Sequence, residues 1–336
     1  MEHHNLPGFI AALLHPQKYP HPAAEIQLVQ THISFVLIAG DFVYKFKKPV
    51  DFGFLDFSTL EKRRYCCEQE LRLNRRLCPE IYLDLVTVNK ESDNFALNGS
   101  GEVMEYGVKM ARMPEEGMMG NLIRAGKLGR AQLDAIVARL IPFYQQAERN
   151  AEIDSFGRAE KVAISILENF DQTQGVIGQG ALTREQFDHI SSWSKAFLTQ
   201  EDLFNRRIAE GCIRDCHGDL YSANICIADQ VYIFDCIEFN QRFRSCDLAS
   251  DVSFLAMDLD FHGLHELSEY FIDRFSQLSG DRGLRELLNF YKCYRAYVRG
   301  KINLFTAADP AVDEAVQAAC TAAAAKYFAL ADSYAA

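Results

Sequence analysis

Residues Cys212–Asn240 combine the side chains from which catalytic bases and metal sites are built, in the sequence CIRDCHGDLYSANICIADQVYIFDCIEFN. Asp219 supplies a carboxylate that could take a proton from a substrate. Asn224 and Asp235 supply an amide oxygen and a carboxylate, the hard oxygen ligands that suit Mg²⁺. His217 stands two residues before Asp219. The segment therefore predicts a metal site beside a catalytic base.

Two short apolar runs between these polar residues predict a β-hairpin. We expect strands at Ile225–Ile227 and Val231–Phe234, joined by a two-residue turn at Asp229-Gln230. That turn would place Asn224 directly opposite Asp235, with Cβ atoms about 4.5–5.5 Å apart. The turn lacks the Asn-Gly or Asp-Gly sequence of two-residue hairpins, so a register shifted by one residue is the alternative.

The elements that position these residues begin with a β-rich first third of the chain. Lys45 and Lys47 lie on one face of the third predicted strand, about 7 Å apart. A lysine on the inner face of a sheet needs a partner, because burying an unpaired charge is costly. The predicted strands are Ile26–Gln30, His32–Ala39, Asp41–Phe46, Ile81–Asn89, Asn94–Leu97 and Glu102–Met110.

Helical spacing marks one segment of the first third and most of the remainder. Ser58–Leu77 is expected to be a helix, with Ser58 as N-cap and Glu61 at the third helical position. Asp309 and Pro310 are expected to be the N-cap and first residue of the last helix. The other predicted helices are Gly8–Leu14, Ala131–Glu148, Arg158–Asn169, Arg184–Gln200, Leu203–Glu210, Asp247–Leu259, Leu264–Leu278, Arg282–Leu304 and Val312–Tyr334.

Composition limits the partners. With 336 residues the chain can form two lobes. Its formal net charge of −11 argues against nucleic-acid binding, which needs a basic surface. No apolar run approaches the ~20 residues of a membrane span, so a membrane partner is not expected either. Ten cysteines without a CxxC pair or a secretory leader predict a reduced, cytoplasmic protein.

Several motifs of the segment resemble those of a known family. His217–Leu220 followed by Asn224 has the form H-G-D-x-x-x-x-N. It resembles the catalytic loop of aminoglycoside phosphotransferases and choline-kinase-like small-molecule kinases. Ile233–Asp235 with Glu238 resembles their metal-binding segment, and Cys246–Asp251 resembles the segment that opens their next helix.

The resemblance extends to the first third of the chain and to the order of elements. Tyr44–Arg76 resembles a bacterial branch of the family that is often fused to a P-loop ATPase domain. The fold implied is the α+β, two-lobed protein-kinase-like fold, with a β-rich N-lobe and a mainly helical C-lobe. We place the N-terminal nucleotide-binding lobe at residues 1–113 and the C-terminal lobe, with catalytic loop and metal site, at residues 114–336.

The resemblance also implies roles for individual residues. Asp219 would orient an acceptor hydroxyl and take its proton. Asn224 and Asp235 would hold Mg²⁺ on the phosphates of ATP. Lys45 would grip the phosphates and pair with a helix glutamate, Glu70.

The resemblance implies supporting or alternative roles for several other residues. Lys47 is the alternative lysine and Glu68 the alternative glutamate. His217 would support the catalytic loop and Asp247 would tether it, while Glu238 would assist the metal or contact substrate. The linker that includes Met113 would contact adenine through its backbone.

The function implied is an ATP- and Mg²⁺-dependent phosphotransferase that phosphorylates a hydroxyl of a small polar molecule. A non-catalytic nucleotide-binding protein and a protein Ser/Thr kinase are the alternatives. The segment Gln30–Ser34 lacks the glycines of a phosphate-binding flap, so Thr31 or Ser34 would have to contact phosphate. This absence of glycine favours the non-catalytic nucleotide-binding protein. Arg295 and Arg299 could line an anionic substrate pocket, although a salt bridge is the preferred interpretation. The acceptor, the choice between ATP and GTP and the oligomeric state stay open.

Overall fold

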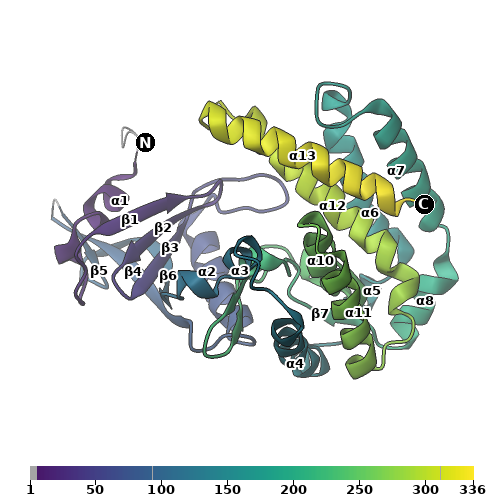
Figure 1. Ribbon diagram of the computed structural model, residues 1–336. Coiled ribbons are helices and arrows are strands. Elements are labelled where there is room, and N and C mark those ends of the chain that lie inside the picture. Colours follow the sequence, from purple (N-terminus) through teal and green to yellow (C-terminus); the bar gives the residue numbers. More distant parts are fainter. Residues whose placement is uncertain (1–5, 93, 311) are drawn as a thin grey trace. The chain divides into compact units, whose positions relative to one another are not determined.

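The computed structural model describes residues 6–92, 94–310 and 312–336 (Figure 1). Residues 1–5 of the predicted N-lobe lie outside this description. The chain divides into two compact units: unit 1 contains Met1–Met118 and Cys226–Asn240, and unit 2 contains Met119–Ile225 and Gln241–Ala336. The segment that holds Asp235 therefore belongs with the β-rich part of the chain.

Unit 1 is built on a six-stranded antiparallel sheet with strand order β1-β2-β3-β6-β4-β5. All six predicted strands are present. Their bounds are β1 Ile26–Gln30, β2 Ser34–Ala39, β3 Phe42–Lys47, β4 Tyr82–Glu91, β5 Asn94–Leu97 and β6 Glu102–Ala111. Two short helical segments, α1 Gly8–Leu13 and η1 Pro16–Lys18, precede the sheet.

The alternation of β3 sorts its side chains between two faces of the sheet. Tyr44 and Phe46 are buried in an apolar cluster that also contains Leu13 of α1. Lys45 and Lys47 therefore point to the opposite face. Lys47 is only 1% exposed there, which demands charged partners.

Helix α2, Leu60–Asn74, packs on this second face, against β4 and β6. Its N-cap is Thr59, whose hydroxyl accepts a hydrogen bond from the Lys62 N–H at 3.3 Å. The prediction of Ser58 as N-cap was wrong by one residue. The Ser58 hydroxyl instead donates to Asp56 Oδ1 at 2.6 Å, which leaves the capping role to the next hydroxyl along the chain.

The predicted hairpin forms, with its second strand one residue shorter than expected. Strands β8, Ile225–Ile227, and β9, Val231–Ile233, are joined by three residues, with the Ala228 N–H donating to the Gln230 carbonyl at 3.0 Å. Asn224 ends the short helix η4, Ser222–Asn224, and Asp235 lies beyond β9. Both residues therefore flank the hairpin strands, and the expectation that Asn224 faces Asp235 stays a prediction.

Unit 2 is mainly helical, as predicted. A short sheet pairs β7, Ile213–Asp215, with β10, Ser245–Asp247. The helices are α3 Met119–Arg124, α4 Arg130–Gln146, α5 Ala151–Ser155, α6 Ala159–Thr173, α7 Arg184–Phe197, α8 Glu201–Ala209, α9 Gln241–Arg244, α10 Leu248–Phe261, α11 His265–Ser279, α12 Leu284–Ala308 and α13 Glu314–Tyr334. Two single turns complete the chain, η2 Glu115–Gly117 in unit 1 and η3 Gln174–Val176.

The last two helices lie side by side (Figure 1). The predicted start of α13 was wrong: Asp313 is its N-cap and accepts from the Val316 N–H at 3.0 Å. Asp309, the predicted cap, instead ends α12, which runs four residues beyond the predicted Leu304. An aspartate can end one helix as readily as it begins another, and the sequence does not distinguish the two positions.

Two further observations bear on the sequence analysis. All ten cysteines are free. Among the helices in the described ranges, none is both long enough and apolar enough to cross a membrane.

Candidate active site

Five charged side chains of unit 1 meet on the inner face of the sheet and form what we term the lysine–acid cluster. Lys45 Nζ lies 2.9 Å from Glu70 Oε1 and 2.5 Å from Asp235 Oδ1. Lys47 Nζ lies 2.7 Å from Glu70 Oε2 and also contacts Glu238. The strand β3 thus presents both lysines to one carboxylate of α2 and to the segment after β9.

Glu70 contacts both lysines, so its pairing does not show which of them would bind phosphate. Its Oε1 forms an ion pair with Lys45, while Lys47 donates to Oε2. Exposure separates the lysines: the Lys45 side chain is 16% exposed and the Lys47 side chain 1%. Glu68, the alternative glutamate, accepts from Arg64 at 2.8 Å on the exposed side of α2 and takes no part.

Opposite charges within the cluster keep its lysines protonated although they are buried. Burial alone would lower the pKa of both lysines, but Asp235, Glu70 and Glu238 raise the pKa of Lys45, and Glu238 and Glu70 raise that of Lys47. Burial alone would raise the pKa of Glu70, but the two lysines hold it below its ordinary value. Burial does raise the pKa of Glu238. In formal charges, the cluster contains three carboxylates and two ammonium groups.

Replacing Glu70 with Gln is expected to remove an acid-sensitive part of the stability of unit 1. A carboxylate with a depressed pKa stabilises the fold fully above its unfolded pKa, here 4.5, and loses that contribution as the pH falls toward about 2. Urea unfolding should therefore show wild type more stable than Glu70→Gln at neutral pH, with a difference that shrinks through this window. Parallel pH curves for the two proteins would contradict the arrangement.

Asp235 is held in an unusual backbone conformation. Its φ of 61° lies in the left-handed region, which few residues other than glycine and asparagine or aspartate adopt. Its N–H donates to the Tyr82 hydroxyl at 3.1 Å, and the next N–H, of Cys236, donates to Asn74 Oδ1 at 2.8 Å. These two bonds fasten the segment to β4 and α2. The Asp235 side chain remains 43% exposed, so its carboxylate is open to a cation from solvent.

In unit 2 the predicted catalytic residues lie on the loop between β7 and η4. Asn224 Nδ2 donates to Asp219 twice, to the carbonyl oxygen at 3.0 Å and to Oδ2 at 2.9 Å. His217 is fully buried, and its Nδ1 accepts from the Asp219 N–H at 3.2 Å. Asp219 itself is partly exposed between buried neighbours. The loop therefore presents one oriented carboxylate, and its backbone is bonded to the buried His217 ring.

Asp251, in the first turn of α10, ties this loop down. It accepts from the N–H groups of His217 at 2.9 Å and Gly218 at 2.8 Å, and from the Tyr144 hydroxyl at 2.8 Å. Gly218 has a φ of 86°, a conformation that a residue with a side chain rarely adopts. This explains the glycine of the H-G-D motif: the turn presents two successive N–H groups to one carboxylate.

The prediction that Asp247 tethers the loop was therefore wrong. Asp247 caps α10 by accepting from the Ala249 N–H at 2.8 Å. Its two oxygens accept from Arg207 at 2.8 and 2.7 Å. Both aspartates belong to the segment that resembles the family's helix opening, but Asp247 is the N-cap of α10 and Asp251 lies in its first turn.

Sequence reasoning also missed the role of Arg295 on α12. Its Nη1 donates to the Gly218 carbonyl at 3.0 Å and its Nε to the Ser250 carbonyl at 3.3 Å. Arg295 thus holds the loop through backbone oxygens, which is neither a salt bridge nor an anion pocket. No sequence signal marks such a bond, because the acceptors are main-chain atoms.

Asp251→Asn is expected to loosen the loop. The variant keeps one oxygen for three donors, so it should lose about 1–3 kcal/mol of the free energy of unfolding. Tyr144→Phe removes only one of the three bonds and should cost less, about 1 kcal/mol. Denaturant unfolding of both variants shows whether Asp251→Asn loses more of the free energy of unfolding than Tyr144→Phe. Equal stability of Asp251→Asn and wild type would show that the tether is not important for the fold.

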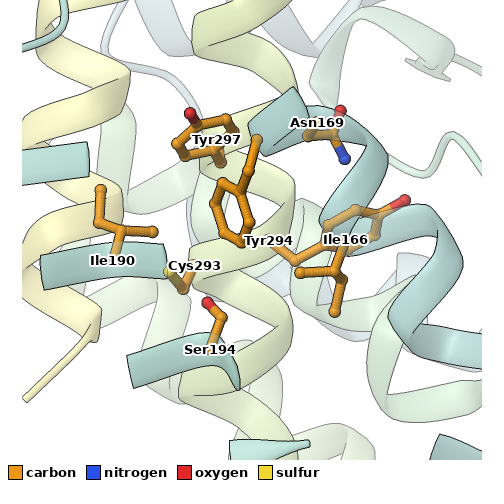
Figure 2. Close-up of a pocket in the computed structure, with 8 residues that line it drawn as sticks. Ile166, Asn169, Ile190, Ser194, Cys293, Tyr294 and Tyr297 are labelled. Atoms are coloured by element: carbon orange, nitrogen blue, oxygen red, sulfur yellow. The ribbon is translucent and has the colours of Figure 1, made fainter. Parts of the chain in front are cut away.

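Other predicted features lie apart from these residues. The Met113 side chain, which follows β6, packs against the apolar cluster containing Val108 and Cys226, and its backbone contact with adenine stays a prediction. A cavity of about 10 Å³ lies between α6, α7 and α12 and holds at most about one water. Figure 2 shows the side chains that line it. The cavity contains no predicted site residue, so it is a packing gap. Its lining residues are Ile166, Asn169, Phe170, Ile190, Ser194, Cys293, Tyr294 and Tyr297.

The donor set at the predicted metal site is small. Within the described parts of the chain, no group of three or more His, Cys, Asp or Glu side chains is arranged to hold a metal ion. The predicted ligands, Asn224 and Asp235, are one amide and one carboxylate. Each offers an oxygen, the donor type that Mg²⁺ prefers, and neither offers the sulfur or imidazole nitrogen typical of structural zinc sites.

Comparisons with known proteins identify relatives of unassigned activity. No protein-family model matches the chain. Proteins of Mycobacterium tuberculosis and Mycobacterium bovis are 35% identical to it over 287 residues, and both are described as uncharacterized. The match covers 84% of this chain and 56% of each relative, so the chain spans about half the length of the curated relatives it matches.

Solved structures identify the fold. An ethanolamine kinase of Plasmodium vivax matches with a TM-score of 0.49 at 12% identity, covering 91% of this chain and 81% of that one. A choline/ethanolamine kinase family protein from Mesorhizobium loti matches with a TM-score of 0.50 at 11% identity, covering 97% of this chain and 98% of that one. Over nearly its whole length the chain therefore has the α+β, two-lobed protein-kinase-like fold that its motifs predicted.

Proposed function

We propose that the protein is an ATP- and Mg²⁺-dependent phosphotransferase that phosphorylates a hydroxyl of a small polar molecule. The observation that carries the proposal is the Asp219 carboxylate, which is partly exposed and is oriented by Asn224 at 2.9 Å. A fixed carboxylate at the surface of a buried loop suits a group that positions a hydroxyl and accepts its proton.

The lysine–acid cluster supports the nucleotide part of the proposal. Lys45, the more exposed lysine, would contact the ATP phosphates, and Glu70 would hold it in place. Asp235 and Asn224 would hold Mg²⁺, which neutralises charge on the phosphates when bound. The carboxylates of the cluster outnumber its lysines, which suits the binding of a cation. The Asn224 amide nitrogen donates to Asp219, which leaves the amide oxygen to bind Mg²⁺.

The proposed transfer is a single displacement at the γ-phosphorus of ATP. The acceptor oxygen forms a bond to the γ-phosphorus, the bond between that phosphorus and the β–γ bridging oxygen breaks, and ADP leaves. The hydroxyl proton passes to Asp219, while His217 keeps the loop in place. Adenine would lie against the backbone near Met113.

Ten free cysteines support a reducing, cytoplasmic setting.

One observation favours the alternative of a non-catalytic nucleotide-binding protein. The glycine-free turn between β1 and β2 is closed by its own bonds: the Thr31 N–H donates to the Ser34 carbonyl at 2.9 Å, and Thr31 Oγ1 accepts from the Ser34 N–H at 2.9 Å. The Ser34 side chain is 1% exposed, so the predicted contact of its hydroxyl with phosphate does not fit this arrangement. Weak nucleotide binding would follow from such a turn.

A transfer screen separates the candidates. Purified protein with Mg-ATP, and separately with Mg-GTP, is assayed for acceptor-dependent release of nucleoside diphosphate across sugars, amino-sugars, amino-alcohols, hydroxy acids and nucleosides. The proposal predicts release with at least one small acceptor. Nucleotide binding without turnover on any of them would favour the non-catalytic protein, and phosphate found only on added proteins would favour a protein kinase.

A further inference from the structure

Helix α12 carries two arginines one turn apart, and their partners differ: Arg299 contacts tyrosines, with a hydrogen bond to Tyr327. Arg295 donates to the carbonyls of Gly218 and Ser250. Arg299 forms no ion pair with any residue in the described part of the chain, and its Nε is buried without a hydrogen-bond partner. The salt bridge preferred from the sequence is therefore missing at Arg299.

Three other buried arginines each contact a carboxylate: Arg63 with Glu105, Arg207 with Asp247, and Arg244 with Asp215. Arg295 has no carboxylate partner, but its guanidinium donates to backbone carbonyls. A largely enclosed guanidinium with neither an ion-paired carboxylate nor a carbonyl acceptor is costly to the fold. Its presence at Arg299 indicates a ligand that supplies the missing charge.

Aromatic rings hold the Arg299 guanidinium in place. Its central carbon lies 4.7 Å from the centroid of the Tyr221 ring and 5.8 Å from that of Tyr327. Tyr221 stacks on Phe254 at 5.2 Å, and Tyr327 stacks on Phe261 at 3.8 Å. A guanidinium that packs on rings keeps N–H groups at its edge, and this fork matches the oxygens of a carboxylate or phosphate.

The position of this guanidinium is fixed by close helix packing. At Gly300 an added Cβ would lie 2.9 Å from the Phe328 ring, so only glycine lets α13 approach this closely. That approach brings Tyr327, the neighbour of Phe328, to Arg299. Tyr221 comes from the catalytic loop, two residues after Asp219. Burial alone would lower the pKa of Arg299, but Tyr221, Tyr327 and Asp219 raise it, so the group stays charged beside the loop.

We propose that Arg299 binds an anionic group of the acceptor, so that the acceptors are hydroxylated carboxylates or hydroxylated phosphate esters. The proposal rests on the phosphotransferase function above, because it concerns the molecule whose hydroxyl meets Asp219. Carboxylates and phosphate esters share an oxyanion, planar or tetrahedral, whose oxygens accept hydrogen bonds from two N–H groups of one guanidinium. The overall charge of −11 would repel such a molecule from most of the surface, so a dedicated cation is needed to hold it.

Two acceptor series with constant skeletons test the charge requirement. One contains glycerate, glycerol 3-phosphate, glycerol and 3-amino-1,2-propanediol; the other contains gluconate, glucose 6-phosphate, glucose and glucosamine. Wild type, Arg299→Gln and Arg299→Lys are compared with Arg285→Gln, an exposed arginine of α12 that pairs with Glu269 and Asp273. Thermal unfolding of each variant checks that it is folded.

Wild type should prefer an anionic member, and Arg299→Gln should lower the ratio of kcat/KM for the anionic member to kcat/KM for the neutral member of the same series about 100-fold. Arg299→Lys should keep part of the preference, and Arg285→Gln all of it. The carboxylate and phosphate arms show which oxyanion is used. A preference for neutral or cationic acceptors, or an anion preference that survives in Arg299→Gln, would overturn the proposal.

Binding separates this inference from the proposed function. Glycerate, gluconate and inorganic phosphate are titrated into nucleotide-free wild type and Arg299→Gln, with NMR line broadening of the probe as readout. Binding that is lost in Arg299→Gln supports the anion site even if no acceptor is phosphorylated, in which case the phosphotransferase proposal alone fails. Equal binding, or none, in both proteins contradicts the anion site.

Discussion

Asp219→Asn is expected to lower the rate of phosphate transfer about 10²–10⁴-fold, the usual contribution of a positioned general base. The amide keeps the shape of the carboxylate and can still accept from Asn224, so the loop should keep its structure. Because the nucleotide contacts are assigned to other residues, the affinity for Mg-ATP should change by no more than about twofold. Steady-state kinetics and nucleotide titration measure the two effects separately.

A matched control is available on the surface of the same unit. Asp202, in the first turn of α8, is exposed, and Asp202→Asn makes the same chemical change away from the loop. It should retain full activity. Full activity of Asp219→Asn would contradict the role of Asp219, and a large loss of nucleotide affinity would move that residue from the acceptor to the nucleotide.

Arg207→Met is expected to cause the largest loss of stability, about 3–5 kcal/mol of the free energy of unfolding. The Arg207 side chain is fully buried and contacts Asp247 at 2.7 Å and Asp281 at 2.5 Å. Its removal leaves two buried carboxylates without a counter-charge. Burial already raises the pKa of Asp247 with the arginine present, so this carboxylate should take up a proton in the variant.

The neighbouring residue provides the control for this prediction. Arg206 pairs with Glu286 at 2.6 Å, but these side chains are 46% and 53% exposed. Arg206→Met should therefore cost less than about 1 kcal/mol. Urea unfolding of the two variants compares a buried with an exposed ion pair on the same helix. Similar midpoints for both would show that the buried network contributes little to the fold.

Local patterns predicted the elements of the fold because they depend on short stretches of sequence. Alternation located β3 and placed Lys45 and Lys47 on one face, and the structure agrees. Helix ends were less predictable. Ser58 and Thr59 offer equivalent hydroxyls, and the contact of Ser58 with Asp56 decides which one caps α2.

Long-range contacts of the site could not be predicted in the same way. The H-G-D-x-x-x-x-N motif located the loop, because a short segment carries its own geometry. The choice of Asp251 over Asp247 as its tether depends on how α10 is rotated against the loop. The bond from Arg295 to a carbonyl depends on packing across 77 positions of sequence, and no side-chain pattern records it.

The most direct test of the central claim is ³¹P NMR of a reaction containing the protein, Mg-ATP and the acceptor mixture of the transfer screen. Wild type should convert the γ-phosphate resonance into that of a phosphate monoester with equal formation of ADP. Asp219→Asn should leave the ATP spectrum unchanged over the same time. A spectrum in which wild type produces only inorganic phosphate, or no product at all, would contradict the assignment of Asp219 as the base of a phosphotransferase.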